Sequence, residues 1–201
     1  MKFIYLKRIL IGILVVSLII VLFIKITHGT IAPWKVVYFS SMLKEENHIN
    51  NGASKIKQLR EKYKEYYINN TLIEVGSEAT DETLYSGKDP YRLIFRFWTL
   101  DGEKTFTIKS IEILNDDLNY AYENLNYEGM IKKRSVLNGS NWEESLSEFA
   151  LGVYYTPYDF DLYDYNSDIH VRLLGAIDNE NIDLEINLTK YEKKGFIRWG
   201  Y

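Results

Sequence analysis

Residues 169–189, IHVRLLGAIDNENIDLEINLT, carry the clearest structural pattern of this chain. Asp178 to Asn181 divides them into two halves and consists of residues that favour turns. A period of two with a polar opposite face predicts an antiparallel hairpin with one face on a core and the other exposed. The alternating apolar residues are Ile169, Val171 and Leu173, then Ile182, Leu184, Ile186 and Leu188.

The segment of residues 91–113 shows the same alternation. Asp101-Gly102 lies inside it and favours a type I′ turn. A two-residue loop would place Phe97 opposite Phe106, so we expect a second hairpin here. The apolar parity changes after position 108, which predicts a β-bulge near residues 109–110.

Helices are expected in three places. Apolar residues three and four positions apart predict helices over residues 35–46 and 53–67. Ser140-Asn-Trp-Glu143 matches a capping box, which would begin a third helix that Pro157 ends.

Short strands are expected over residues 71–75 and 118–124. Helices are then followed by hairpins, one more helix and a last hairpin. This order predicts the α+β class, with two helices packed on a curved antiparallel β-sheet built from hairpins, and one further helix.

An apolar run without a charged side chain lies close to the N-terminus. Residues 9–24 are almost all aliphatic and follow the basic residues Lys2, Lys7 and Arg8. This pattern predicts a signal-anchor transmembrane helix over residues 1–27, which crosses the membrane through residues 9–26. The basic residues favour a cytoplasmic N-terminus. The alternative is a signal peptide that is cleaved near Gly29.

The remaining residues are then expected on the extracytoplasmic side of a single-pass protein of the cell membrane. Residues 28–33 are predicted to be a short tether, and residues 34–201 a single extracytoplasmic α+β domain. The chain contains no cysteine, which fits a bacterial envelope protein that is built without disulfide bonds.

The charge of the chain limits its partners. Four of the 24 basic residues and none of the 28 acidic residues lie within residues 1–29, so residues 30–201 carry a net charge of −8. An acidic domain repels phosphate backbones, and we therefore expect no nucleic-acid partner.

Catalytic motifs are absent from the sequence. It contains no GxSxG, HExxH, P-loop or GxGxxG motif, and its histidines, His28, His48 and His170, have no metal-ligand partner beside them. We therefore predict no enzyme activity, no catalytic residue, no cofactor and no metal ion. Two alternatives stay open: a hydrolase with paired carboxylates, and a weak metal site within Asp159–Asp168.

The segment YYTPYDFDLYDY, residues 154–165, concentrates aromatic and acidic side chains. Tyrosine supplies contact area at low entropic cost, and acids favour a basic partner. The alternative is a loop that folds its rings over the sheet, and both hold if Tyr154 and Phe160 point inward while Asp161, Tyr163 and Asp164 point outward. The partner-binding candidates, from this loop and from the polar face of the last hairpin, are Asp159, Asp161, Tyr163, Asp164, Tyr165, Arg172, Asp183 and Glu185.

Asn141-Trp-Glu-Glu-Ser-Leu-Ser-Glu148 and Tyr154-Tyr-Thr-Pro157, in a cysteine-free chain with this order of elements, resemble the TipC-type immunity proteins of Gram-positive bacteria. The resemblance implies a membrane-anchored protein that binds and occludes a cognate antibacterial toxin. The toxin would be secreted by a type VII system and act on a cell-wall precursor at the outer membrane face. Charge reversal at Asp161, Asp164 and Glu185 is then expected to weaken toxin binding.

A protein of another class fits the same sequence. An anchored cell-envelope sensor or assembly factor would bind a peptide or a wall fragment in the concavity of the sheet. An immunity gene is expected beside the gene for a secreted toxin, whereas a sensor or assembly factor is expected beside regulatory or wall-building genes.

Overall fold

The computed structural model describes residues 7–8, 11–21, 31–42, 52–79, 90–115, 118, 120–138, 143–162 and 165–198. These residues divide into two compact units, Met1–Val36 with Lys193–Tyr201 and Val37–Glu192. The elements in chain order are β1 (Ile31–Ser40), α2 (Gly52–Lys62), the 3-10 helix η1 (Lys64–Tyr66), β2 (Tyr67–Ile68), β3 (Thr71–Ala79), β4 (Tyr91–Thr99), β5 (Lys104–Ile113), β6 (Ala121–Tyr122), β7 (Tyr127–Asn138), β8 (Glu143–Tyr155), β9 (Ile169–Ile177) and β10 (Glu180–Arg198).

The first unit contains a helix over residues 11–21. Among the described residues, no helix combines the length and the apolar character that crossing a bilayer requires. The predicted transmembrane helix through residues 9–26, the signal anchor and the single-pass membrane localisation are therefore wrong.

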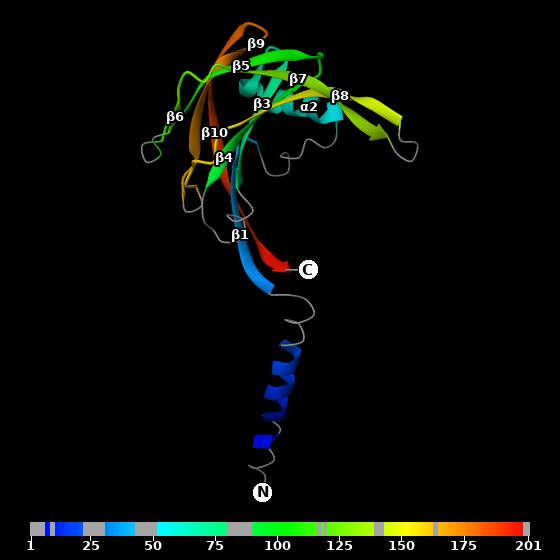
Figure 1. Ribbon diagram of the computed structural model, residues 1–201, viewed down its shortest axis with the longest axis vertical. Coiled ribbons are helices and arrows are strands. Elements are labelled where there is room, and N and C mark those ends of the chain that lie inside the picture. Colours follow the sequence, from blue (N-terminus) through cyan, green and yellow to red (C-terminus); the bar gives the residue numbers. More distant parts are fainter. Residues whose placement is uncertain are drawn as a thin grey trace. The chain divides into compact units, whose positions relative to one another are not determined.

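The second unit is built on an antiparallel sheet that closes on itself (Figure 1). Its strands follow the order β1-β10-β9-β5-β7-β8-β4-β3, and β3 pairs back with β1 through Ser40 and Gly76. The short strands β2 and β6 add to β3 and β5. The closed path joins eight strands of the described part of the chain, so the predicted curved sheet with helices packed on it is wrong.

Two of the three predicted helices are strands. Where residues 35–46 were expected to be helical, β1 runs to Ser40, with Val37 and Phe39 buried on either side of half-buried Tyr38. In place of the helix after Ser140, β8 buries alternate side chains at its C-terminal end. Both segments are rich in β-branched and aromatic residues, and pairing with neighbouring strands outweighs an apolar spacing that also fits a helix.

The predicted helix over residues 53–67 is confirmed as α2 followed by η1. The four residues expected on its apolar face, Ile56, Leu59, Tyr63 and Tyr66, are all buried. In Figure 1, α2 lies beside β3 and β8, with which it is in contact. It is the single α-helix of the described second unit.

The last hairpin is confirmed, and the hairpin of residues 91–113 is not. β9 pairs with β10 with Leu173 opposite Leu184, and the turn is formed by Asp178 and Asn179 alone instead of by Asp178 to Asn181. β4 pairs with β3 and β8, whereas β5 pairs with β6, β7 and β9. The Phe97 and Phe106 rings still stack at 4.3 Å, but they meet across the inside of the closed sheet. The predicted bulge is confirmed by the register shift between Ile108 and Ser110.

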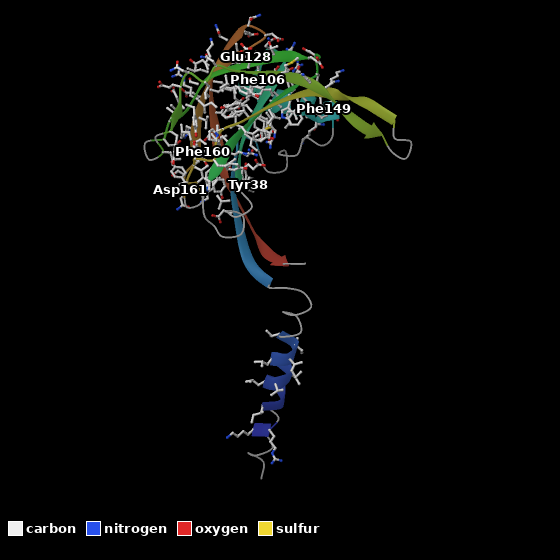
Figure 2. The ribbon with its side chains drawn as sticks, in the orientation of Figure 1. Tyr38, Phe106, Glu128, Phe149, Phe160 and Asp161 are labelled. Carbon is white, nitrogen blue, oxygen red and sulfur yellow. The ribbon has the colours of Figure 1, made fainter. Side chains whose placement is uncertain are left out.

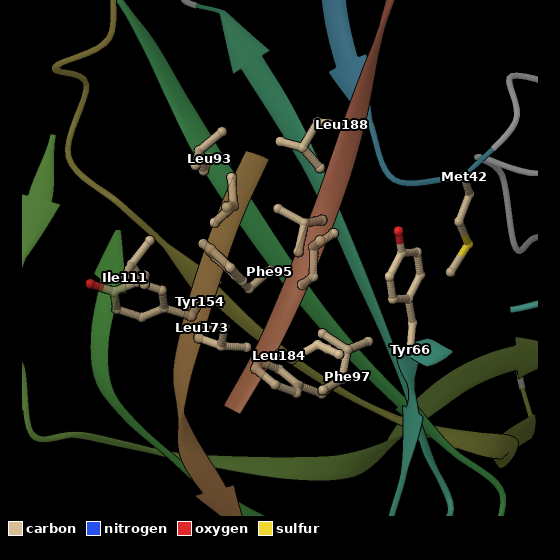
Figure 3. Close-up of a cluster of buried hydrophobic side chains, with 14 of the residues drawn as sticks. Met42, Tyr66, Leu93, Phe95, Phe97, Ile111, Tyr154, Leu173, Leu184 and Leu188 are labelled. Carbon is tan, nitrogen blue, oxygen red and sulfur yellow. The ribbon is translucent and has the colours of Figure 1, made fainter. Parts of the chain in front are cut away.

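The inside of the sheet is filled by side chains, as the close-up in Figure 3 shows for Phe95, Phe97 and Tyr154. Two glycines make room for the Phe106 ring. A Cβ at Gly129 would lie 2.3 Å from this ring, and a Cβ at Gly152 would lie 2.8 Å from it. The close approach explains why these strand positions lack a side chain.

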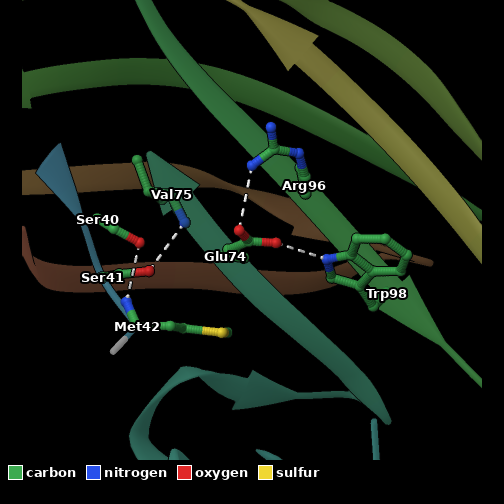
Figure 4. A network of polar contacts seen from close by, with 7 residues as sticks. All are labelled: Ser40, Ser41, Met42, Glu74, Val75, Arg96 and Trp98. Atoms are coloured by element: carbon green, nitrogen blue, oxygen red, sulfur yellow. Dashed lines mark hydrogen bonds and ion pairs between the residues drawn. The ribbon is translucent and has the colours of Figure 1, made fainter. Parts of the chain in front are cut away.

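Serine side chains support the closure of the sheet between β1 and β3 (Figure 4). The Val75 amide donates to Ser41 Oγ at 2.9 Å, and the Ser41 amide donates to the Val75 carbonyl at 2.8 Å. The Phe39 amide donates to Ser77 Oγ at 2.8 Å. Side chains therefore supply hydrogen bonds at this closure in addition to the backbone pairing.

A buried acid lies on the same strand as the closure. Glu74 is 2% exposed, and its carboxylate pairs with Arg96 at 3.1 Å and accepts a hydrogen bond from Trp98 Nε1 at 3.0 Å (Figure 4). A buried carboxylate is tolerated because both oxygens have strong donors. We assign this group a structural role.

Candidate binding surface

The aromatic and acidic segment after β8 is tied to the start of β4. The Leu93 amide donates to Thr156 Oγ1 at 2.9 Å, and the Thr156 amide donates to the Leu93 carbonyl at 3.0 Å. Further along, Phe160 and Tyr91 exchange two backbone hydrogen bonds of 2.8 and 3.1 Å. These four bonds fix the path of residues 155–161, which we call the rim loop.

Buried side chains anchor the rim loop to the hydrophobic core. Phe160 and Leu162 are fully buried, and Tyr154, directly before the loop, is 8% exposed. Asp161 is exposed, and Figure 2 shows it next to Phe160. The expectation that Tyr154 and Phe160 point inward and Asp161 outward is therefore confirmed. Tyr163 and Asp164 lie outside the described residues.

Two exposed tyrosines of the rim loop hold an arginine between them. The Arg92 guanidinium carbon lies 4.1 Å from the Tyr155 ring centroid and 4.6 Å from that of Tyr158. Arg92 Nε donates to Glu78 Oε2 at 2.6 Å, and the two side chains form an ion pair. Tyr155 is 46% exposed and Tyr158 is 37% exposed. The stack therefore presents two aromatic rings to solvent in a defined orientation.

The rim loop also carries Asp159. Its Oδ2 accepts a hydrogen bond from the Tyr122 hydroxyl at 2.8 Å. The rings of Tyr120 and Tyr122 pack edge-on against Phe160, with centroids 4.9 and 5.9 Å away. Burial, followed by the hydrogen bond to Asp159, raises the pKa of the Tyr122 hydroxyl well above its usual value. Tyr122 therefore stays protonated and keeps donating to Asp159 at neutral pH.

The predicted residues of the last hairpin lie on the outer face of the sheet. Arg172 donates to both carboxylate oxygens of Asp183, with Nε and Nη2 each at 2.8 Å. Glu185 and Glu112 lie directly beside Arg172 on the neighbouring strands. The hydrogen bond from Arg172 lowers the pKa of Asp183, and the same bond raises the pKa of Arg172. We call Glu112, Arg172, Asp183 and Glu185 the acidic row.

The structure does not join the two predicted groups. No contact within the described residues links Asp159 or Asp161 to Arg172, Asp183 or Glu185. Tyr165 belongs to neither group, because it is half-buried and its hydroxyl accepts a hydrogen bond from Asn115 Nδ2 at 2.9 Å. The rim loop and the acidic row therefore share no hydrogen bond or ion pair within the described residues.

Several residues of the rim loop surface were missed from the sequence. Tyr155 and Tyr158 lie in the aromatic segment, but nothing in the sequence separates them from the buried rings beside them. Arg92 and Glu78 are missed because they come from neighbouring strands. They become neighbours only through the register of β3 and β4, which places them directly opposite each other.

Histidine and acidic side chains occur among the described residues, some of them at this surface. No group of three histidine, aspartate or glutamate side chains within them is arranged to hold a metal ion. His170 is exposed, as expected for a residue of the polar face, and its backbone amide donates to Asn115 Oδ1 at 2.8 Å. The arrangement is suited to contact with another molecule through rings and carboxylates.

Comparison with known proteins adds no relative. No family model, no curated protein and no solved structure matches this chain.

Proposed function

We propose that this chain is an immunity-type binding protein, which neutralises a protein toxin by occluding it. The observation that carries the proposal is the stack of Arg92 between the exposed rings of Tyr155 and Tyr158. Exposed tyrosines on a fixed backbone are typical of residues that dominate the affinity of protein interfaces.

Preorganisation supports an occluding role. Ordering a flexible loop on binding costs free energy, which reduces affinity. The rim loop is already held by its bonds to Leu93 and Tyr91 and by the buried Phe160 side chain. Little further ordering is needed, so most of the contact energy can contribute to affinity.

Charge indicates the kind of partner. Asp159 and Asp161 are exposed, and neither forms an ion pair with a described residue. Together with the net charge of −8 over residues 30–201, they favour a partner with a basic contact surface. The resemblance to TipC-type immunity proteins suggests a toxin of type VII secretion that acts on a cell-wall precursor as this partner.

The alternative function, a cell-envelope sensor or assembly factor, needs space for a ligand in the concavity of the sheet. A sensor or assembly factor was expected to bind its ligand in the concavity of the sheet. The described sheet closes on itself, and its inside is occupied by Phe95, Phe97 and Phe106. We therefore do not propose a peptide or wall fragment inside the sheet.

The test uses the full chain and the purified secreted toxin encoded beside its gene. Calorimetry is expected to show a 1:1 complex, and toxin activity is expected to fall in proportion to the chain added until one equivalent is present. A toxin that remains fully active at excess chain, with no heat of binding, would contradict the proposal. Inhibition by far less than one equivalent would instead indicate that the chain acts as an enzyme on the toxin.

A further inference from the structure

The closure of the sheet between β1 and β3 is built differently from the neighbouring pairing of β3 with β4. In the described part of the chain, β3 pairs with β4 over its whole length but meets β1 where Ser40 lies opposite Gly76. Side-chain hydroxyls add to this pairing, since Ser41 Oγ accepts a hydrogen bond from the Val75 amide at 2.9 Å (Figure 4). A closure that depends on a few such bonds is expected to open more readily than a full strand ladder.

Tyr91, the first residue of β4, adds a hydrogen bond to β1 from inside the core. Its hydroxyl donates to the Val37 carbonyl at 3.0 Å. Tyr91 is 1% exposed and Val37 is fully buried. Loss of one partner of a buried hydrogen bond costs free energy, so the Tyr91 hydroxyl stabilises β1 in its closed position.

The backbone of the same residue holds the rim loop. The Tyr91 amide donates to the Phe160 carbonyl at 2.8 Å, and the Phe160 amide donates to the Tyr91 carbonyl at 3.1 Å. Phe160 is in turn the buried anchor of the rim loop. Tyr91 is therefore bonded to β1 through its side chain and to the rim loop through its main chain.

The place of Tyr91 in its strand makes these bonds important. The ends of a strand open more readily than its middle, and Tyr91 begins β4. Its pairing with Ala79 of β3 is the last of the β3–β4 register. The position of Tyr91 is therefore expected to depend on the bonds to Val37 and Phe160 as well as on this pairing.

We propose that Tyr91 is a positioning residue of the rim loop, which couples the rim loop to the closure of the sheet between β1 and β3. Opening of the closure then loosens the rim loop in the free chain. A partner bound to the rim loop stabilises the closure, because a coupling free energy acts equally in both directions. This second consequence rests on the proposed function, whereas the first concerns the free chain alone.

The experiment follows residue-resolved hydrogen exchange of the full free chain by NMR. Ser41→Ala removes the hydroxyl that accepts from the Val75 amide, and it is expected to speed exchange of the Phe39 amide at the closure roughly fivefold. The same variant is expected to speed exchange of the Phe160 amide roughly threefold or more, although Ser41 has no bond to the rim loop in the described residues.

A double variant shows whether the effect passes through Tyr91. Tyr91→Phe removes only the hydroxyl that bonds to β1. In this background, adding Ser41→Ala is expected to leave exchange of the Phe160 amide unchanged, because the connection is already broken. A purely structural role of Tyr91 would leave the two effects additive.

Ser110→Ala is the matched control. Ser110 is as buried as Ser41, at 8% exposed, and its hydroxyl has no hydrogen-bond partner among the described residues. This variant is expected to change exchange neither at the closure nor at the Phe160 amide. The amides of the β9–β10 hairpin report global unfolding and are expected to keep their rates in every variant.

Three outcomes would overturn the inference. They are a Phe160 amide that does not respond to Ser41→Ala, a response of the same size with and without the Tyr91 hydroxyl, and an equal acceleration in the β9–β10 hairpin. Ser41→Ala compared with Ser110→Ala keeps the test decisive even if Tyr91→Phe does not fold.

The toxin complex separates this inference from the proposed function. Toxin binding is expected to slow exchange of the Phe39 amide together with that of the Phe160 amide. A complex that slows exchange only within residues 155–161 would overturn the coupling and leave the occlusion proposal intact. Coupling in the free chain without any toxin complex would contradict the occlusion proposal and leave the coupling intact.

Discussion

The rim loop and the acidic row are both exposed and charged, and both were predicted as contact sites, but they are built differently. In the acidic row, Arg172 donates twice to Asp183, with Glu185 and Glu112 alongside. In the rim loop, Asp159 and Asp161 have no counter-ion among the described residues, and exposed tyrosine rings lie next to them. A surface charge that already has an ion-pair partner contributes little to affinity for another protein. An acid without a counter-ion, beside aromatic rings in fixed positions, can contribute more to that affinity.

The largest expected effect comes from removing the anchor of the rim loop. Phe160→Ala deletes a fully buried ring and is expected to lower the free energy of unfolding by about 3–5 kcal/mol. Urea denaturation measures the change. The matched control Asp161→Ala, at the exposed position next to it, is expected to stay within about 0.5 kcal/mol of the wild type. Equal losses in the two variants would show that Phe160 does not anchor the loop.

The next effect separates the two surfaces by affinity. Tyr155→Ala or Tyr158→Ala is expected to weaken the toxin complex by about 2 kcal/mol, roughly 30-fold, because each removes an exposed ring. Asp183→Asn, in the acidic row, is expected to change affinity by less than about threefold. Calorimetry measures all three. A larger loss for Asp183→Asn than for the tyrosine variants would reverse the assignment.

Association rates provide a finer test. Asp161→Lys is expected to slow toxin association roughly three- to tenfold at low salt, since exposed charges steer encounter more than they hold the complex. Glu185→Lys is expected to have a smaller effect because Arg172 already offsets the negative charge beside it. Stopped-flow measurements at two salt concentrations check both expectations. Association that does not depend on salt would contradict them.

Alkaline titration tests the contact between Tyr122 and Asp159. The pKa of Tyr122 is raised by burial and then by its hydrogen bond to Asp159. Above pH ~10 the folded chain therefore keeps a proton that the unfolded chain has lost. The contribution of this hydroxyl to the free energy of unfolding is fully present below that pH and is lost as the pH rises through the folded-state pKa. Asp159→Asn is expected to lower the Tyr122 pKa only in part, as phenolate absorbance would show. An unchanged pKa would rule out the carboxylate as a cause.

The smallest effect concerns the acidic row. The Arg172 hydrogen bond lowers the pKa of Asp183 below its usual value. Its contribution to stability is present above the unfolded carboxyl pKa of about 3.9 and is lost as pH falls through the folded-state pKa. Arg172→Gln is expected to raise the Asp183 pKa toward normal with little change in stability. Carboxyl NMR signals followed through an acid titration measure the shift, and no shift would contradict the pairing.

The secondary structure could be predicted from the sequence where the apolar spacing fits only a helix or only a strand. The β9–β10 hairpin has an unbroken period of two and a turn whose residues, Asp178 and Asn179, tolerate their positive φ angles of 46° and 73°. In residues 35–46 and after Ser140, the apolar spacing fits a helix as well as a strand. For β1 the choice is made by pairing with β3 and β10, which are distant in sequence. β8 pairs with the preceding strand β7 and with the distant strand β4, and the apolar spacing of a single segment contains neither pairing.

The hairpin predicted around Asp101-Gly102 shows the same limit. The turn residues and the apolar alternation are present, but β4 finds its partners in β3 and β8. Phe97 and Phe106 therefore meet across the inside of the sheet instead of along a hairpin.

The candidate site was predictable as a segment but not as an arrangement. Its composition identifies residues 154–165 as rich in tyrosine and acid. Which rings are buried, and that Arg92 lies between Tyr155 and Tyr158, follow from the bonds of the loop to β4.

Hydrogen exchange of the 1:1 complex against the free chain tests the central claim most directly. If the rim loop is the contact surface, toxin binding is expected to slow amide exchange within residues 155–161 and in β6, while the acidic row exchanges as in the free chain. Slower exchange confined to the exposed face of β9 and β10, with residues 155–161 unchanged, would contradict the account.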